Sequence, residues 1–168
     1  MRVCLIIPPS SFLLDDRVFV SLGILRVGAV LLQRGYEVDL LDLSGNHNYV
    51  KEVEKYDRDA IFGITATTPQ LQSSVNISRL LRKRGHKVIL GGPHVSLVNA
   101  AHKKIGSRAT KALAELHEEF DVLVAGDGEE AIIPAIKGEG LIDADIPKGV
   151  FFLTNKQLNE MPMPARHL

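Results

Sequence analysis

A pair of glycines ends a short apolar strand in the stretch ILGGPH, residues 89–94. A second apolar run, VLVAGDGE at residues 122–129, ends in another glycine-bearing turn. In an open α/β sheet, ligands bind outside the carboxyl ends of the strands. Because glycine has no Cβ, it lets a bulky ligand approach the backbone closely and it tolerates a positive φ. The two turns together therefore predict a ligand crevice, although each alone also fits an ordinary turn between a strand and a helix.

Apolar runs alternate with amphipathic, helix-like stretches on both sides of these turns. The runs are rich in Val, Ile and Leu, as in strands buried on both faces, and lie at residues 3–7, 37–43, 60–64, 87–90 and 121–125. The sequence RGYEV at 34–38 recurs as RGHKV at 84–88, and each copy fits a helix end, a glycine cap and a strand start. This pattern predicts an α/β fold, a Rossmann-like or flavodoxin-like parallel sheet of about five strands in the order 2-1-3-4-5, flanked by helices. We expect a last short strand at 149–153.

Size and composition fit one globular domain. The chain has 168 residues, of which 45% are hydrophobic and 24% charged, close to the average for soluble domains. The 20 Lys and Arg residues balance the 20 Asp and Glu residues, so no basic excess favours nucleic acid. The first apolar run stops at Pro8-Pro9, unlike a signal peptide, and no run is long enough to span a membrane. We therefore expect a cytoplasmic protein with neither a nucleic-acid nor a membrane partner.

Sequence motifs of several common enzyme classes are absent. Pro8-Pro9 follows the first strand, where a dinucleotide fingerprint would place glycines, and no P-loop, zinc-ligand pair or nucleophile elbow occurs. The third strand ends at Ile64-Thr65, where a phosphoacceptor receiver domain needs an aspartate. The single cysteine, Cys4, lies in an apolar strand and is expected to act as a small hydrophobe. We predict no catalytic residue and no direct metal ligand in this chain.

The residues predicted to contact a ligand follow the first, third, fourth and fifth strands. Most are small, hydroxylic or backbone-rich groups, which bind and orient a ligand but form no acid–base pair. Glu129 either accepts hydrogen bonds from ligand amides or only stabilises the N-terminus of the next helix. The predicted set is Pro9, Ser10, Thr65, Thr67, Gly91, Gly92, Pro93, His94, Gly126, Asp127, Gly128 and Glu129.

The order and spacing of the motifs resemble the N-terminal cobalamin-binding domain of B12-dependent radical S-adenosylmethionine enzymes. The matching stretches are IIPP at 6–9, SLGIL at 21–25, RGYEV at 34–38 with Asp42, LGGPH at 90–94 and GDGE at 126–129. The tail MPMPARHL at 161–168 resembles the segment that leads into the radical domain of such enzymes. The resemblance implies a cobalamin-binding domain at residues 1–138 and an extension or linker at 139–168.

The resemblance also implies how the cofactor lies. The nucleotide tail of cobalamin would enter beside Gly91 and Gly92, with hydroxyls of Thr65 and Thr67 bonded to it, and residues 126–129 would border the corrin ring. The D-x-H-x-x-G motif of methionine synthase-type domains is absent. We therefore expect base-off cobalamin, whose lower face is open or meets a residue of the loop 10–17. The stretch 95–120 is longer than such domains lead us to expect.

The resemblance covers no radical domain. The C-x-x-x-C-x-x-C iron–sulfur motif is missing, because Cys4 is the only cysteine. We therefore expect the chain alone not to be catalytic and to serve a radical S-adenosylmethionine domain or subunit, in trans or lost by truncation. In the family's usual role, the cobalt carries a methyl group to a substrate radical. Two other functions stay open: a flavodoxin-like or sugar-nucleotide-binding half-domain of a transferase, and a degenerate scaffold without a ligand.

Overall fold

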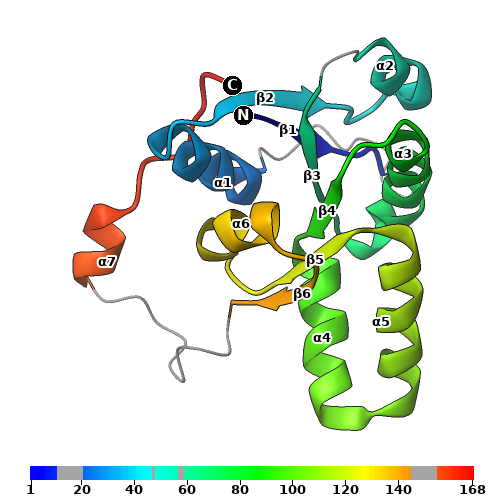
Figure 1. Ribbon diagram of the computed structural model, residues 1–168. Coiled ribbons are helices and arrows are strands. Elements are labelled where there is room, and N and C mark those ends of the chain that lie inside the picture. The colour runs from blue at the N-terminus through cyan, green and yellow to red at the C-terminus, as the bar shows by residue number, and fades with distance from the viewer. Residues whose placement is uncertain (11–20, 47, 57–58, 145–154) are drawn as a thin grey trace.

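The computed structural model describes residues 1–10, 21–46, 48–56, 59–144 and 155–168. Its centre is a parallel sheet of six strands in the order β2-β1-β3-β4-β5-β6 (Figure 1). The strands are β1 (Arg2–Ile7), β2 (Glu37–Asp42), β3 (Ile61–Thr65), β4 (Val88–Gly91), β5 (Val122–Ala125) and β6 (Gly140–Asp143). The predicted α/β fold and strand order are confirmed, and β6 extends the sheet beyond β5. The strand expected at 149–153 lies outside the described residues.

Helices cover both faces of the sheet. They are α1 (Leu22–Gln33), α2 (Tyr49–Lys55), the 3-10 helix η1 (Thr68–Gln70), α3 (Leu71–Lys83), α4 (Pro93–Ile105), α5 (Ser107–Glu119), α6 (Gly128–Lys137) and α7 (Asn155–Glu160). α1 and α6 lie on one face, and α2, α3 and α5 lie on the other (Figure 1). α4 and α5 form a long hairpin that extends past the sheet, and this hairpin accounts for the long stretch 95–120. In the described ranges, no helix has the length and apolar character that a membrane span needs.

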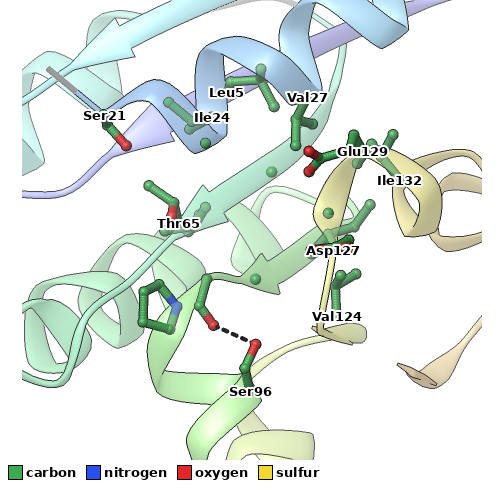
Figure 2. A pocket seen from close by; sticks show the side chains of 18 of the residues that line it. Leu5, Ser21, Ile24, Val27, Thr65, Ser96, Val124, Asp127, Glu129 and Ile132 are labelled. Atoms are coloured by element: carbon green, nitrogen blue, oxygen red, sulfur yellow. Dashed lines mark hydrogen bonds between the residues drawn. The ribbon is translucent and has the colours of Figure 1, made fainter. Parts of the chain in front are cut away.

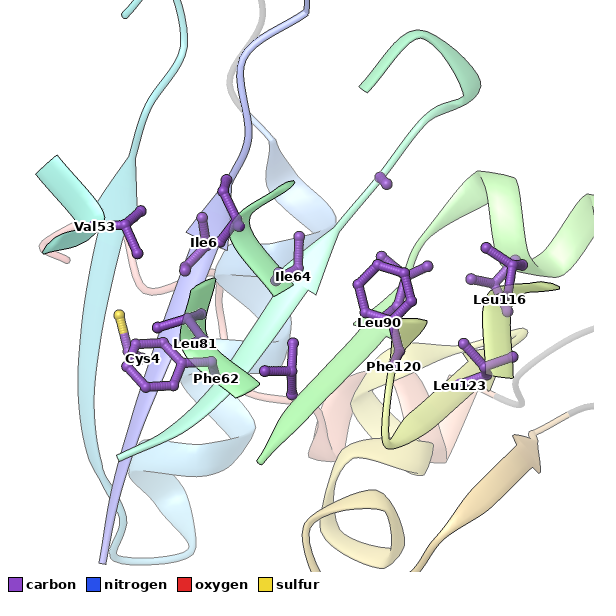
Figure 3. Packing of buried hydrophobic residues seen from close by; sticks show 14 of the residues in the cluster. Cys4, Ile6, Val53, Phe62, Ile64, Leu81, Leu90, Leu116, Phe120 and Leu123 are labelled. Atoms are coloured by element: carbon purple, nitrogen blue, oxygen red, sulfur yellow. The ribbon is translucent and has the colours of Figure 1, made fainter. Parts of the chain in front are cut away.

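Two apolar layers hold the helices on the sheet, because side chains alternate between the faces along each strand. The layer beneath α2, α3 and α5 is centred on Phe62 and Leu123 (Figure 3). Cys4 is fully buried in this layer and acts as a small hydrophobe, as predicted. The layer beneath α1 and α6 contains Leu5 and Val124.

The C-terminal segment 161–168 packs back against α1. The backbone N–H of Ala165 donates to the carbonyl oxygen of Leu25 at 3.1 Å, and Ala165 is buried. The side chain of Leu168 lies against Gly28, where a Cβ would come within 2.8 Å of Leu168 Cδ1. This segment therefore packs on α1 through Ala165 and Leu168.

Candidate functional site

A cavity of about 370 Å³ opens at the carboxyl ends of β3, β4 and β5 and is bordered by α1 and α6 (Figure 2). This volume lies in the range of small-molecule sites. Eight of the residues predicted from sequence line the cavity: Thr65, Gly91, Gly92, Pro93, Gly126, Asp127, Gly128 and Glu129. The two glycine-bearing turns therefore meet at one cavity.

The floor of the cavity is a point where the sheet lacks a side chain. Gly63 of β3 lies between Leu5 of β1 and Ile89 of β4 in the strand register, and all three residues line the cavity. A Cβ at Gly63 would come within 3.0 Å of Leu5 Cδ2. Because Gly63 has no Cβ, the Leu5 side chain packs across it, and Leu5, Gly63 and Ile89 together form an apolar floor of the cavity.

The two glycines that follow Leu90 contribute differently. Gly92 has a φ of +98°, and a Cβ there would lie 2.8 Å from Thr65 Oγ1 and 2.9 Å from Ala66 N. Its missing side chain therefore lets the turn after β3 pack against it. A Cβ at Gly91 would meet only Val124, at an ordinary contact distance of 3.6 Å from Val124 Cβ. At Gly91, the missing side chain leaves room in the cavity itself.

Glu129 brings a carboxylate to the side of the cavity formed by α6. Its side chain is 16% exposed, and its Oε1 lies 3.3 Å from Nε of Arg26 on α1. The ion pair joins the two helices that border the cavity. Since a carboxylate has about four acceptor positions, Glu129 can accept further hydrogen bonds while it is paired with Arg26.

Three of the other predicted residues lie on the loops that follow β1 and β3 and do not line this cavity. Pro9 is buried and Ser10 is half-buried after β1, whereas Thr67 is exposed. The Thr67 hydroxyl caps η1 and lies 2.8 Å from Gln70 Oε1. Gln70 Nε2 in turn donates to the carbonyl oxygen of Pro8 at 2.8 Å, which joins the two loops.

His94 also lies beside the cavity and not in its lining. Its Nδ1 is 3.0 Å from Thr68 Oγ1, and its backbone N–H donates to the carbonyl oxygen of Ala66 at 3.0 Å. Burial lowers the pKa of the His94 imidazole below its usual value. Burial therefore favours the neutral form of the ring.

Sequence patterns did not reveal most of the apolar lining or two polar groups, Ser21 and Ser96. The missed residues are Leu5, Ser21, Gly23, Ile24, Val27, Gly63, Ile64, Ile89, Ser96, Val124 and Ile132. The apolar members have the same pattern as core residues. Gly63 did carry a signal, since a glycine inside a strand often marks a close approach by a ligand or by another backbone.

The site combines an apolar slot with a rim of hydroxyl, backbone and carboxylate groups. Within the described residues, no group of three or more His, Cys, Asp and Glu side chains could hold a metal ion. Such a site suits a ligand with a flat apolar part and polar groups that donate hydrogen bonds. The fold and the site together define a ligand-binding α/β domain with its crevice at the carboxyl edge of the sheet.

The family model of the B12 binding domain matches residues 17–134, well over half of the chain. The chain therefore belongs to the B12-binding domain family, whose cofactor is cobalamin. The motif-based expectations of this family and this cofactor are confirmed.

No curated protein matches the chain. Two similar solved structures are of the radical S-adenosylmethionine methyltransferase TsrM from Kitasatospora setae. The structure with cobalamin and a 4Fe-4S cluster bound is 19% identical over 54% of this chain, with a TM-score of 0.47. The structure with tryptophan substrate and the SAM analog aza-SAM bound is 19% identical over 68% of this chain, with a TM-score of 0.48. The chain spans 18% and 26% of the lengths of those two chains.

Proposed function

We propose that the chain holds cobalamin base-off, with the nucleotide tail in the cavity and the corrin ring over the carboxyl edge of the sheet. The observation that carries this proposal is the cavity over Gly63, where Leu5, Gly63 and Ile89 of three neighbouring strands form an apolar floor. The tail of cobalamin ends in dimethylbenzimidazole, which is flat and mostly apolar. Leu5 and Ile89 supply apolar contact beside Gly63, and Gly91 keeps the entrance free of a side chain.

Polar groups at the cavity match the rest of the cofactor. The Thr65 hydroxyl lies at the entrance, where the ribose and phosphate of the tail would pass. Asp127 and Glu129 present carboxylates to the corrin ring, whose side chains end in amides that donate hydrogen bonds. Pro93 and the backbone of residues 126–128 complete this rim. Pro9, Ser10, Thr67 and His94 remain proposed contacts of the exposed part of the cofactor.

The base-off state follows from where the tail lies. A benzimidazole buried in the cavity is not available to the cobalt. No histidine occurs between Pro8 and Val20 to replace it. We propose that the lower face of the cobalt is open or meets a residue of the loop 10–17, of which residues 11–17 lie outside the described ranges.

The chemistry of the site belongs to the cofactor, and the protein binds and orients it. When bound, cobalamin supplies a cobalt centre that can carry a methyl group. The Gly63 slot holds the tail and excludes water from it, while the Glu129–Arg26 pair fixes the carboxylate at the rim. We propose that a radical S-adenosylmethionine domain or subunit provides the substrate radical, and that residues 139–168 lead toward that domain.

Titration with hydroxocobalamin and with cobinamide, a corrinoid that lacks the nucleotide tail, tests this proposal. We expect a base-off absorbance spectrum that survives desalting. We also expect cobalamin to bind at least about tenfold tighter than cobinamide, because only cobalamin fills the slot. Equal affinity for both corrinoids contradicts tail burial. Binding of a flavin or a sugar nucleotide without binding of either corrinoid would support the transferase half-domain, and no binding at all would support the empty scaffold.

A further inference from the structure

Ser96 on α4 joins the two glycine-bearing turns. Its Oγ donates a hydrogen bond to the carbonyl oxygen of Gly92 at 3.2 Å and accepts one from the backbone N–H of Gly126 at 3.0 Å. A serine hydroxyl has one donor and two acceptor positions, so both hydrogen bonds form at once. Figure 2 shows Ser96 on the cavity wall opposite α1, with the dashed line marking its bond to Gly92.

Ser96 is the first of three polar residues on one face of α4. Asn99 and Lys103 follow it by three and seven positions, a spacing that keeps them on the same side of a helix. Asn99 Nδ2 donates to Asp143 Oδ2, and Lys103 Nζ lies 2.5 Å from the same oxygen. Asn99 and the side chain of Asp143 are each 3% exposed. α4 therefore fixes the end of β5 through Ser96 and the end of β6 through Asn99 and Lys103.

The turn after β5 depends on this support. Gly126 has a φ of +81°, and residues 126–127 alone connect β5 to α6, which begins at Gly128. The turn carries Asp127 and leads into Glu129, both of which line the cavity. Ser96 therefore links the part of the cavity wall that carries Asp127 and Glu129 to the turn at Gly92.

We propose that Ser96 is a positioning residue for the cobalamin site, an inference that rests on the proposed function. It sets the spacing between the turn where the tail enters, at Gly91-Gly92, and the rim at residues 126–129. Because Ser96 already holds both turns in place, a bound cofactor can contact both of them, and binding does not have to order either turn first. Loss of the hydroxyl frees the Gly126 turn and weakens corrin contacts, while the Gly63 slot stays in place.

The chain offers a matched control in Ser74. Its Oγ donates to the carbonyl oxygen of Gln70 at 2.8 Å, the same bond to the residue four positions earlier that Ser96 makes to Gly92. Ser74 is buried in α3 and does not line the cavity. Ser74→Ala therefore removes the bond within the helix without removing a link between turns.

The test compares Ser96→Ala, Ser96→Thr and Ser74→Ala with the wild-type chain. For Ser96→Ala we expect about tenfold weaker binding of both hydroxocobalamin and cobinamide, with their ratio of affinities kept. We also expect faster hydrogen exchange of the Gly126 amide in the protein without cofactor. Ser96→Thr keeps a hydroxyl and should restore both properties, whereas Ser74→Ala should change neither, whatever it does to the melting temperature.

Several results would overturn the inference. Wild-type affinity and wild-type Gly126 exchange in Ser96→Ala would do so. So would equal losses of affinity in Ser96→Ala and Ser74→Ala, which would indicate general destabilisation. In each of these cases the wild-type chain binds cobalamin, so the proposed function stands. Failure of the wild-type chain to bind any corrinoid would overturn the proposed function itself.

Discussion

Leu5 of β1 lies directly beside Gly63 of β3 in the parallel register, and the cavity opens where Gly63 has no side chain. We expect Gly63→Val to fill this floor, because even a Cβ there would come within 3.0 Å of Leu5 Cδ2. Overpacking of this kind costs roughly 1–3 kcal/mol of unfolding free energy. Cobalamin affinity should fall by about tenfold or more, whereas cobinamide affinity should change by less than about threefold. Absorbance titration with both corrinoids measures the difference.

Phe62→Leu is the control on the same strand. Phe62 is fully buried but packs in the opposite layer, beneath α2, α3 and α5. The substitution should destabilise the fold by a similar amount, roughly 1–3 kcal/mol, and leave cobalamin binding intact. Equal losses of cobalamin affinity in the two variants would show that the Gly63 floor does not hold the tail.

Most of the fold could be predicted because strands buried on both faces form continuous apolar runs. The repeated sequence at 34–38 and 84–88 marked two boundaries between helix and strand. β6 was missed because Gly140–Asp143 is short, begins with glycine and is only half-buried. It is a strand through its pairing with β5, a tertiary contact that no local pattern reveals.

The site could be predicted where it lies on the turns that directly follow the strands, including the side chains of Thr65, Asp127 and Glu129. Glycine-bearing turns after strands mark a crevice, so Gly91 and Gly126 were found from sequence. Leu5 and Ile89 were missed because an apolar residue facing a slot has the same pattern as one facing a helix. Ser96 was missed because its importance lies in a hydrogen bond across 30 positions of sequence, to Gly126.

A comparison of Glu129 with Glu130 distinguishes two roles of an acid at the start of α6: contact with the ligand and stabilisation of the helix N-terminus. Both lie in its first turn; Glu129 lines the cavity and pairs with Arg26, whereas Glu130 is exposed outside the cavity lining. We expect Glu129→Gln to weaken cobalamin binding about three- to tenfold, because the charged acceptor is lost. Glu130→Gln removes the same charge from the helix N-terminus, an effect of about 0.3–1 kcal/mol on stability, and should leave the affinity unchanged. Equal affinity losses in corrinoid titrations would assign Glu129 to helix stabilisation alone.

We expect His94 to make the stability of the fold depend on pH. Burial lowers the pKa of its imidazole below the usual 6.5, so the unfolded chain binds more protons between the folded and unfolded values. The free energy of unfolding therefore falls as the pH drops from 6.5 through that window, and the contribution is fully present above it. His94→Gln cannot be protonated, so its stability should depend less on pH between about 7 and 5. Urea denaturation across this range measures the effect, and identical pH profiles of the two proteins would contradict it.

The C-terminal segment 161–168 should contribute to the stability of α1, because Ala165 is only 4% exposed and its N–H donates to Leu25. Ala165→Glu would bury a carboxylate without a partner, so we expect the segment to leave α1 instead. The loss of its contacts should lower the free energy of unfolding by about 1–3 kcal/mol and speed hydrogen exchange of the residue 165 amide. His167→Glu introduces the same side chain at an exposed position two residues later and should change neither quantity. If Ala165→Glu keeps wild-type stability and slow exchange of the residue 165 amide, the prediction is wrong. The segment would then tolerate a charge at residue 165, and the burial of Ala165 would not be what holds it on α1.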